Sequence, residues 1–312
     1  MIEGGHRSEA LYAHALRMLE LGHPSGAVEP LRELLASEPE HADAHALLAL
    51  VLRDLRRVHA AAYEAEQAVA LAPLEAFPHR ALGLVRLAQR QLAAADEHLT
   101  QALALAPDDA SNHVALAALR QFQGRIADAR ALLEEGLERE PEYLDLHVAL
   151  GELALDAGAH AEAARWADEA LERAPDHRAA LVLKGSVLLR RGEVAEAREH
   201  ALWALRQRAD DPGALYLLAG VKARESLTLG LWWRWNVWMT ELGQTRSIVL
   251  LLASYVAYRI LTLALEDLAL PWLATVADVV WLALCAYTWI GPARFRRALE
   301  KELRGVELDD EF

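Results

Sequence analysis

The chain has 312 residues, a formal net charge of −14 and 54% hydrophobic residues, enough to bury a large core. A nucleic-acid-binding protein needs a basic face, and we find no compact basic patch before residue 225, so we exclude that class. The one cysteine, Cys285, allows no internal disulfide, and no secretory signal is predicted at the N-terminus. We therefore expect the bulk of the chain to face a reducing cytoplasm.

From the N-terminus to about residue 211 the sequence repeats with a period of 34 residues. One register holds Pro39, Pro73, Pro107, Pro141 and Pro175; a second holds Ala27, Ala61, Ala95, Ala129, Ala163 and Ala197; a third holds Ala15, Ala49, Gly83, Ala117, Gly151, Gly185 and Ala219. Three registers at one period predict a tandem array of one structural unit.

Each unit has the pattern of two short amphipathic helices. Between residues 110 and 143 apolar and small residues recur at intervals of three or four residues. Gly124 interrupts the pattern, and Pro141 follows the second helix. The predicted units are 8–41, 42–75, 76–109, 110–143, 144–177 and 178–211, with a capping helix at 212–225. Small residues at fixed places allow close helix packing.

This pattern resembles the tetratricopeptide repeat (TPR) family, which pairs a leucine and a small residue in the first helix with alanines in the second and a closing proline. The resemblance implies an all-α, right-handed superhelix of about six helix pairs, with a concave groove that binds a protein partner. The family's groove positions match Glu9, Tyr12, Asp43, Arg53, Phe77, Arg80, Leu84, Val114, Phe122, Asp145, Val148, Glu152, Asp156 and Arg190.

The predicted groove is partly apolar and partly acidic, which favours an extended segment or helix carrying apolar and basic residues. The lysine and asparagine clamp with which some relatives hold a peptide carboxylate is missing, since residues 1–225 contain only Lys184, Lys222 and Asn112 of those types.

Histidines stand at one period, at positions 45, 79, 113 and 147. Zinc ligands must lie about 2 Å from one ion, whereas packed helices are about 8–10 Å apart, so one ion cannot bind all four. We expect each histidine to fill the space between two helices. No HExxH, GxxxxGK or GxSxG motif occurs, and we predict no metal, no cofactor and no enzyme activity.

After residue 225 the composition changes. Segments 247–265 and 272–290 are each 19 residues long with one charge apiece, close to the roughly 20 residues that cross a bilayer. We predict a transmembrane hairpin, with a pair of buried soluble helices as the alternative. Basic residues flank both spans while the connection holds Glu266 and Asp267, so both termini and the array should be cytoplasmic, as in a bacterial inner-membrane protein.

Segment 226–246 contains "GLWWRWNVWM", which places Trp232, Trp235, Trp238 and Met239 on one side of a helix. We predict an amphipathic helix at the membrane interface; the alternative is that these rings cap the last repeat. Residues 291–312 predict a basic amphipathic helix followed by an acidic tail.

Arg259 and Asp278 are equally distant from the middle of the connection, so an antiparallel hairpin places them at one depth. We predict an intramembrane ion pair between them, because a lone charge there costs roughly 2.5–3.5 kcal/mol. The alternative is that Arg259 reaches the interface while Asp278 meets a partner helix.

The sequence therefore predicts a membrane-anchored scaffold or adaptor that recruits a protein partner to the bilayer or assembles it there. The second hypothesis is a subunit of an oligomeric channel-like or transporter-like complex, in which the hairpin acts and the repeats regulate it.

Overall fold

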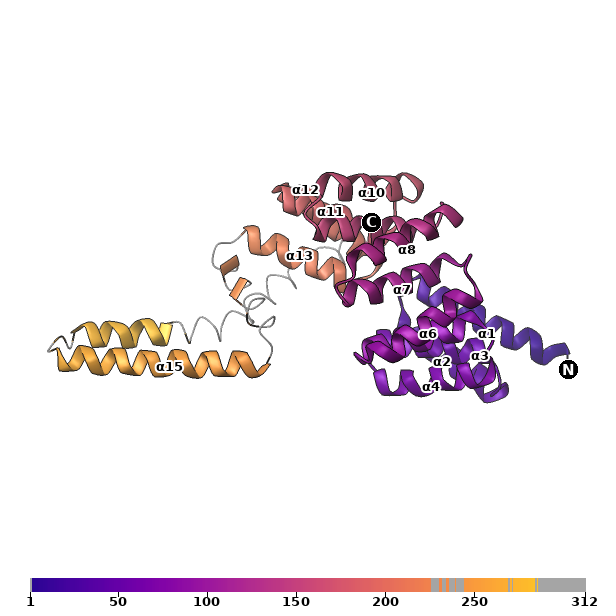
Figure 1. The fold of residues 1–312 in the computed structure, drawn as a ribbon, viewed down its shortest axis with the longest axis horizontal. Helices are drawn as coiled ribbons and strands as arrows, with labels where there is room; N and C mark the ends of the chain where they lie inside the picture. Colours follow the sequence, from indigo (N-terminus) through magenta and orange to yellow (C-terminus); the bar gives the residue numbers. More distant parts are fainter. Residues whose placement is uncertain are drawn as a thin grey trace, which may run out of the picture. The chain divides into compact units, whose positions relative to one another are not determined.

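The computed structural model describes residues 2–225, 230–231, 234–235, 239, 244–268, 270, 272–283 and 285, and Figure 1 shows that their regular structure is helical. The chain forms two compact units, Met1–Arg191 and Gly192–Phe312. The predicted array of residues 1–225 thus extends over both units.

The first unit consists of helix pairs. Its helices are α1 (Ile2–Glu20), α2 (Pro24–Ser37), α3 (Ala42–Asp54), α4 (Val58–Leu71), α5 (Ala76–Ala88), α6 (Leu92–Leu105), α7 (Ala110–Phe122), α8 (Ile126–Arg139), α9 (Leu144–Asp156), α10 (His160–Arg173) and α11 (Arg178–Arg191). The odd-numbered helices are the first helices of the predicted units and the even-numbered ones are the second helices. From α3 on, their starts follow the predicted period, whereas α1 begins at Ile2, before the predicted Ser8.

Small residues allow the two helices of a pair to approach closely. Ala15, Ala49 and Ala117 are buried. A Cβ added to Gly83 of α5 would lie 2.6 Å from Leu99 Cγ of α6, so the glycine is required by that leucine. The core is formed by alanines and leucines that recur with the repeat, for example Ala95 with Leu99.

The periodic histidines lie between helices, as predicted. The Nε2 atoms of His45, His79 and His113 are 3.0, 3.0 and 2.8 Å from the carbonyl oxygens of the periodic prolines Pro39, Pro73 and Pro107. On the other side of the ring, Nδ1 of His45 contacts Glu64 Oε2 at 2.6 Å and Nδ1 of His113 contacts the Leu132 carbonyl at 3.1 Å. His45 and His113 thereby tie a first helix to the preceding turn and to its own second helix, whereas Nδ1 of His147 lies 3.3 Å from the Tyr143 carbonyl oxygen.

In the third pair the residue equivalent to Glu64 is His98, whose Nδ1 lies 3.2 Å from Nδ1 of His79. Burial and the charge of His79 lower the pKa of His98 below its ordinary value of 6.5. Since the folded state disfavours the protonated ring, we expect the free energy of unfolding to fall as the pH drops below about 6.5. His98→Glu should remove this slope, because it removes the ring whose protonated form the folded state disfavours. Urea unfolding at about pH 8 and about pH 5.5 measures both slopes; equal slopes in the two chains would contradict the prediction.

The turn inside each helix pair contains one residue in the left-handed region. Gly22, Gly124 and Gly158 have φ of 75°, 76° and 77°, and the equivalent residues Arg56 and Arg90 have φ of 61°. A side chain in this conformation costs roughly 1–2 kcal/mol, partly offset by the greater flexibility of glycine in the unfolded chain.

Arg56→Gly is therefore expected to stabilise the array by about 0.5–1 kcal/mol, measured as the free energy of unfolding in urea. Gly158→Arg is the inverse change at an equivalent turn and should destabilise the array by a similar amount. No change for both variants would show that the arginine turn is unstrained.

The second unit contains α12 (Val194–Gln207), α13 (Pro212–Glu225) and α15 (Gln244–Asp267), and residues 272–283 form a further helix. α12 packs against α13, which coincides with the predicted capping helix. Figure 1 shows α15 paired with the helix of residues 272–283 as an antiparallel hairpin. Of the predicted interfacial residues, Trp235 and Met239 are described, while Trp232 and Trp238 lie outside the described residues, as does the predicted segment 291–312.

No helix in the described part of the chain is long and apolar enough to cross a membrane. The prediction of two transmembrane spans is therefore not supported. α15 includes the first predicted span and extends beyond it to Gln244 and Asp267. The second predicted span is described only at residues 272–283 and 285.

The predicted ion pair between Arg259 and Asp278 does not form. Instead the Tyr258 hydroxyl donates a hydrogen bond to Asp278. The Tyr258 ring also stacks on Trp281, with centroids 4.7 Å apart. The Arg259 side chain and its charge act on the same Tyr258 hydroxyl.

Candidate partner-binding face

The first helices of the first unit form a continuous surface, since α3 contacts α5, α5 contacts α7, α7 contacts α9, and α9 contacts α11. We call this surface, together with α1, the first-helix face. It carries the predicted groove residues except Val148, which is buried.

At the N-terminal end of the face, the Tyr12 ring stacks on His41 with centroids 5.7 Å apart. Burial and the nearby charge of Asp43 raise the pKa of Tyr12 to about 12, so the phenol is neutral and can donate a hydrogen bond. His41 and Asp43 also line a cavity of about 660 Å³ with Glu38, Glu40 and Glu75. This end of the face combines a flat aromatic pair with carboxylates.

In the middle of the face, Arg80 is held by its neighbours. Its guanidinium lies 5.2 Å from the centroid of the Phe77 ring, donates a hydrogen bond to Asn112 Oδ1 at 2.9 Å and pairs with Asp109. Burial alone would raise the pKa of Asp109, but the Arg80 charge and hydrogen bonds from Ser111 and Arg80 hold it below its ordinary value. Arg80 therefore joins α5 to the start of α7, and its charge is already compensated.

Three carboxylates lie on the exposed side of α9: Asp145, Glu152 and Asp156. Desolvation by the surrounding protein, and then the charges of Asp156 and Asp145, raise the pKa of Glu152 above its ordinary value. The Glu152 side chain nevertheless remains accessible to solvent, although protein surrounds part of it. Asp156 accepts a hydrogen bond from Gln121 at 3.1 Å, and His177 lies 3.5 Å from Asp145. The exposed side of α9 therefore carries more negative than positive charge.

The remaining predicted residues fall into three groups. Val148 is 5% exposed and belongs to the core, so its prediction as a groove residue is wrong; it faces α10 and α11. Leu84, Val114 and Arg53 are half-buried, and Arg53 pairs with Asp54 at 2.8 Å. Glu9, Phe122 and Arg190 are exposed.

Sequence reasoning missed two polar residues that link first helices to the turns beside them. Asn112 is fully buried and donates to the carbonyl oxygens of Ala102 and Ala106 while accepting from Arg80. Tyr143, which immediately precedes α9, shares a 3.2 Å hydrogen bond with Ser111 of α7. The only sequence signal for Asn112 was its rarity in an alanine- and leucine-rich array.

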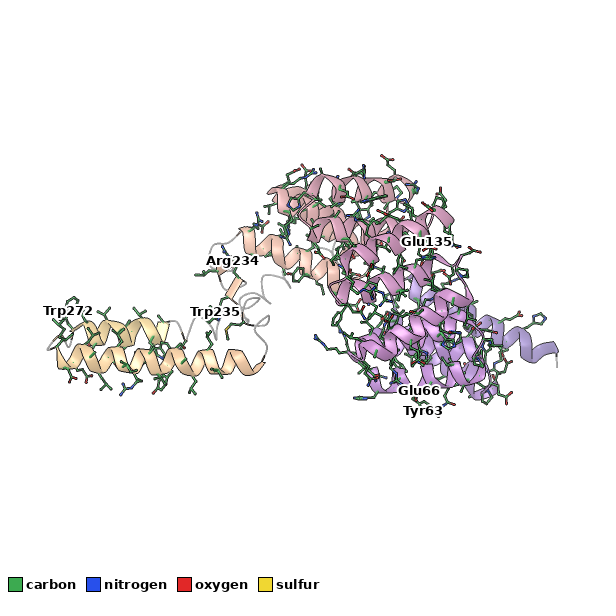
Figure 2. The ribbon with its side chains drawn as sticks, in the orientation of Figure 1. Tyr63, Glu66, Glu135, Arg234, Trp235 and Trp272 are labelled. Atoms are coloured by element: carbon green, nitrogen blue, oxygen red, sulfur yellow. The ribbon has the colours of Figure 1, made fainter. Side chains whose placement is uncertain are left out.

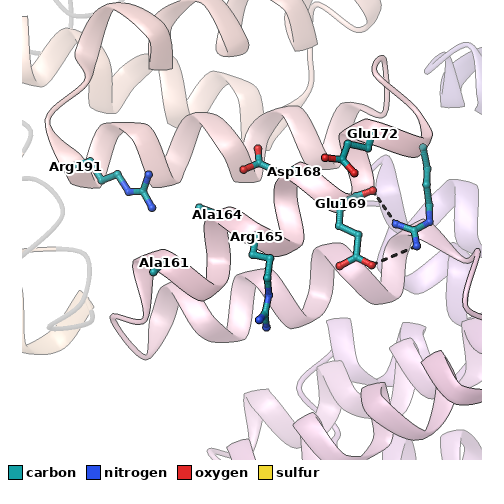
Figure 3. Close-up of a pocket in the computed structure, with 8 residues that line it drawn as sticks. Ala161, Ala164, Arg165, Asp168, Glu169, Glu172 and Arg191 are labelled. Carbon is teal, nitrogen blue, oxygen red and sulfur yellow. Dashed lines mark hydrogen bonds and ion pairs between the residues drawn. The ribbon is translucent and has the colours of Figure 1, made fainter.

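A second cavity of about 650 Å³ lies along α10 and is lined by Arg165, Asp168, Glu169, Glu172, Arg173 and Arg191 (Figure 3). Its charges are largely compensated from within the chain: Arg173 pairs with Glu169 at 3.3 Å and Lys184 pairs with Asp168 at 2.6 Å. Among the described residues no group of three histidine, cysteine or carboxylate side chains is arranged to hold a metal ion.

An array of 34-residue helix pairs that pack on their neighbours and share one continuous face defines a helical repeat protein. Two models of the tetratricopeptide repeat match residues 12–76, 123–183, 166–212 and 182–225, and the chain belongs to this family.

Among solved structures, the chain is similar to TTC0263, a thermophilic TPR protein of Thermus thermophilus, with 25% identity and a TM-score of 0.55 over 58% of this chain and 99% of that chain. It also resembles a chain of the APC/C hetero-tetramer Cut9-Hcn1, with 16% identity and a TM-score of 0.52 over 69% of this chain and 42% of that one. The latter likeness concerns the fold alone. No curated protein matches the chain significantly.

Proposed function

We propose that the protein is a scaffold that binds a protein segment on the first-helix face and holds it at a membrane. The observation that carries the proposal is the continuity of this face from α3 to α11, with aromatic, apolar and acidic side chains at the surface. Helical repeat proteins use such surfaces to bind partners.

The chemistry of the face indicates the kind of segment. Asp145, Glu152 and Asp156 favour basic side chains, and the half-buried Leu84 and Val114 with the exposed Phe122 favour apolar ones. Arg80 contributes no free charge, because Asp109 compensates it. We therefore propose an extended or helical segment that alternates basic and apolar residues.

A photo-crosslinking residue at Phe122 of the full-length chain tests this proposal in the native cell. Phe122 is 50% exposed on α7. Tyr63 is the matched control, because it is 61% exposed on the second helix α4 (Figure 2). We expect one crosslinked partner at position 122 that is absent at position 63. The same product at both positions, or none at position 122, would contradict the proposal.

The membrane part of the proposal rests on the surface of the hairpin in the second unit. Val249, Leu252 and Ile260 of α15 are 60%, 65% and 62% exposed, and Val279 and Val280 on the paired helix are 60% and 62% exposed. An apolar surface of this kind marks a protein or membrane contact. We propose that lipid covers it and that the repeats lie on the cytoplasmic side.

Extraction of membranes with alkaline carbonate tests this part. The full-length chain should stay with the membrane, and Leu252→Glu with Ile260→Glu should release it, whereas the control Tyr63→Glu should not. If the unaltered chain is found in the soluble fraction, the hairpin is covered by protein and not by lipid.

A further inference from the structure

The turns of the first unit lie along two opposite edges, because successive helices of 13 or 14 residues run antiparallel. Turns inside a pair lie together: Gln89 donates to the Val58 carbonyl at 3.5 Å, and Arg191 to the His160 carbonyl at 3.3 Å. Turns between pairs lie together at the other edge, where Arg139 pairs with Asp108 at 2.7 Å. We call these the within-pair edge and the between-pair edge.

The two edges carry opposite net charge. On or next to the within-pair edge stand Arg53, Arg56, Arg57, Arg86, Arg90, Arg120, Arg125, Arg190 and Arg191, against the acidic Asp54, Asp156 and Glu193. On or next to the between-pair edge stand Glu38, Glu40, Asp43, Glu75, Asp108, Asp109, Glu140, Glu142, Asp145 and Asp176, against the basic Arg139, Arg173 and Arg178. The net charge of −14 hides this separation.

Part of this charge has no partner among the described residues. On the within-pair edge, Arg56 and Arg57 are exposed and form no ion pair with any described residue, and Arg90 contacts only the Phe122 ring, at 5.6 Å. On the between-pair edge, Glu40 and Glu75 are exposed and likewise form no ion pair in the described part of the chain. All five residues lie around the second and third helix pairs.

Backbone conformation adds an independent observation. Arg56 and Arg90 are the non-glycine residues of the described chain with positive φ. Equivalent turns use Gly22, Gly124 and Gly158. A residue kept in a strained conformation points to a function for its side chain.

The acidic residues line a cavity that can accept arginine side chains. Glu40 and Glu75, together with Glu38, His41 and Asp43, line the cavity of about 660 Å³ described above. A guanidinium donates hydrogen bonds in a fork that matches carboxylates, and such charge-assisted bonds are among the stronger ones.

We propose that a second copy of this chain docks edge to edge, with Arg56, Arg57 and Arg90 of one copy in the cavity formed by Glu40 and Glu75 of the other. We assign a second copy as the occupant because the basic edge and the acidic edge belong to the same chain. The repeats give the turns the same spacing on both edges, so the charges of two copies can align. The contact joins unlike edges, so it is heterologous and continues into a row of arrays. The contact borders the first-helix face, since Arg90 lies over the Phe122 ring and Asp43 lines the cavity, but it does not depend on the function proposed above.

Charge reversal of the purified full-length chain, solubilised in mild detergent, tests the proposal by sedimentation velocity. The unaltered chain should self-associate at about 0.1 M salt and dissociate at about 1 M, where the Debye length falls from about 10 Å to about 3 Å. The basic-edge variant (Arg56→Glu, Arg57→Glu, Arg90→Glu) and the acidic-edge variant (Glu40→Arg, Glu75→Arg) should each self-associate at least about tenfold more weakly.

Two further samples separate this contact from loss of folding. An equimolar mixture of the two variants should associate, and a chain carrying all five substitutions should regain self-association, because its edges are complementary again. A five-fold variant with normal helical circular dichroism that stays dissociated would overturn the proposal. So would a basic-edge variant that keeps full self-association, or an unaltered chain whose basic edge binds phosphatidylglycerol vesicles without salt-sensitive self-association.

Discussion

Replacement of Arg80 by alanine is expected to destabilise the repeat array by about 2–4 kcal/mol, measured by urea unfolding. The change removes the donor to Asn112 Oδ1, whose residue is fully buried, and the positive charge beside Asp109. A buried acceptor without a donor costs about 1–3 kcal/mol, and hydrogen bonds to charged groups contribute about 1.5–3 kcal/mol.

The pH dependence of the free energy of unfolding shows whether the loss of the Arg80–Asp109 ion pair is the cause. The pKa of Asp109 lies below its ordinary value in the folded chain, so its contribution to stability is present at neutral pH and is lost as the pH falls through the folded pKa. Arg80→Ala should reduce this acid-dependent loss. Arg190→Ala is the control, since Arg190 is exposed, and should change stability by less than about 0.5 kcal/mol. Equal effects of the two substitutions would contradict the structural role of Arg80.

Gly83→Ala is expected to destabilise the third helix pair by about 1–3 kcal/mol, in the range found for overpacked cores. The added Cβ would lie 2.6 Å from Cγ of Leu99 and 3.1 Å from its backbone nitrogen. The leucine side chain can rotate, but the backbone contact can be relieved only by moving α6 away from α5.

A double variant tests whether the clash with Leu99 is the cause. Leu99→Ala leaves a cavity and destabilises on its own, but combined with Gly83→Ala the two costs should be less than additive. Gly124→Ala is a poor match as a control because of its positive φ, whereas Ala117→Gly at the equivalent helix position should cost only about 1 kcal/mol. Strict additivity of the two substitutions would contradict close packing at Gly83.

The repeat architecture was predictable because its signals are local and recur. The periodic prolines, small residues and histidines each report one packing site, and their recurrence along the chain excludes coincidence. Which surface residue meets which neighbour was less predictable, since it depends on rotation about each helix axis. Val148 was placed on the open face and lies in the core; Arg259 was paired with Asp278, although Tyr258 points that way.

Contacts between distant positions of the array were beyond sequence reasoning for a second reason. The Arg80 to Asn112 and Ser111 to Tyr143 hydrogen bonds each join residues 32 positions apart. Nothing in the repeat period predicts them, because the equivalent residues of other units differ in type. The opposite charge of the two edges was present in the sequence, but it emerges only when the turns are sorted by edge.

The most direct test of the central proposal is the dissociation constant of the crosslinked partner for three full-length chains. One is unaltered, one carries Asp145→Asn, Glu152→Gln and Asp156→Asn on the first-helix face, and one carries Glu29→Gln, Glu134→Gln and Glu138→Gln, three exposed carboxylates on second helices. We predict binding at least about tenfold weaker for the first-helix variant and within about twofold of the unaltered chain for the second-helix variant. Equal weakening of both variants, or weakening of the second-helix variant alone, would contradict the assignment of the first-helix face as the partner-binding surface.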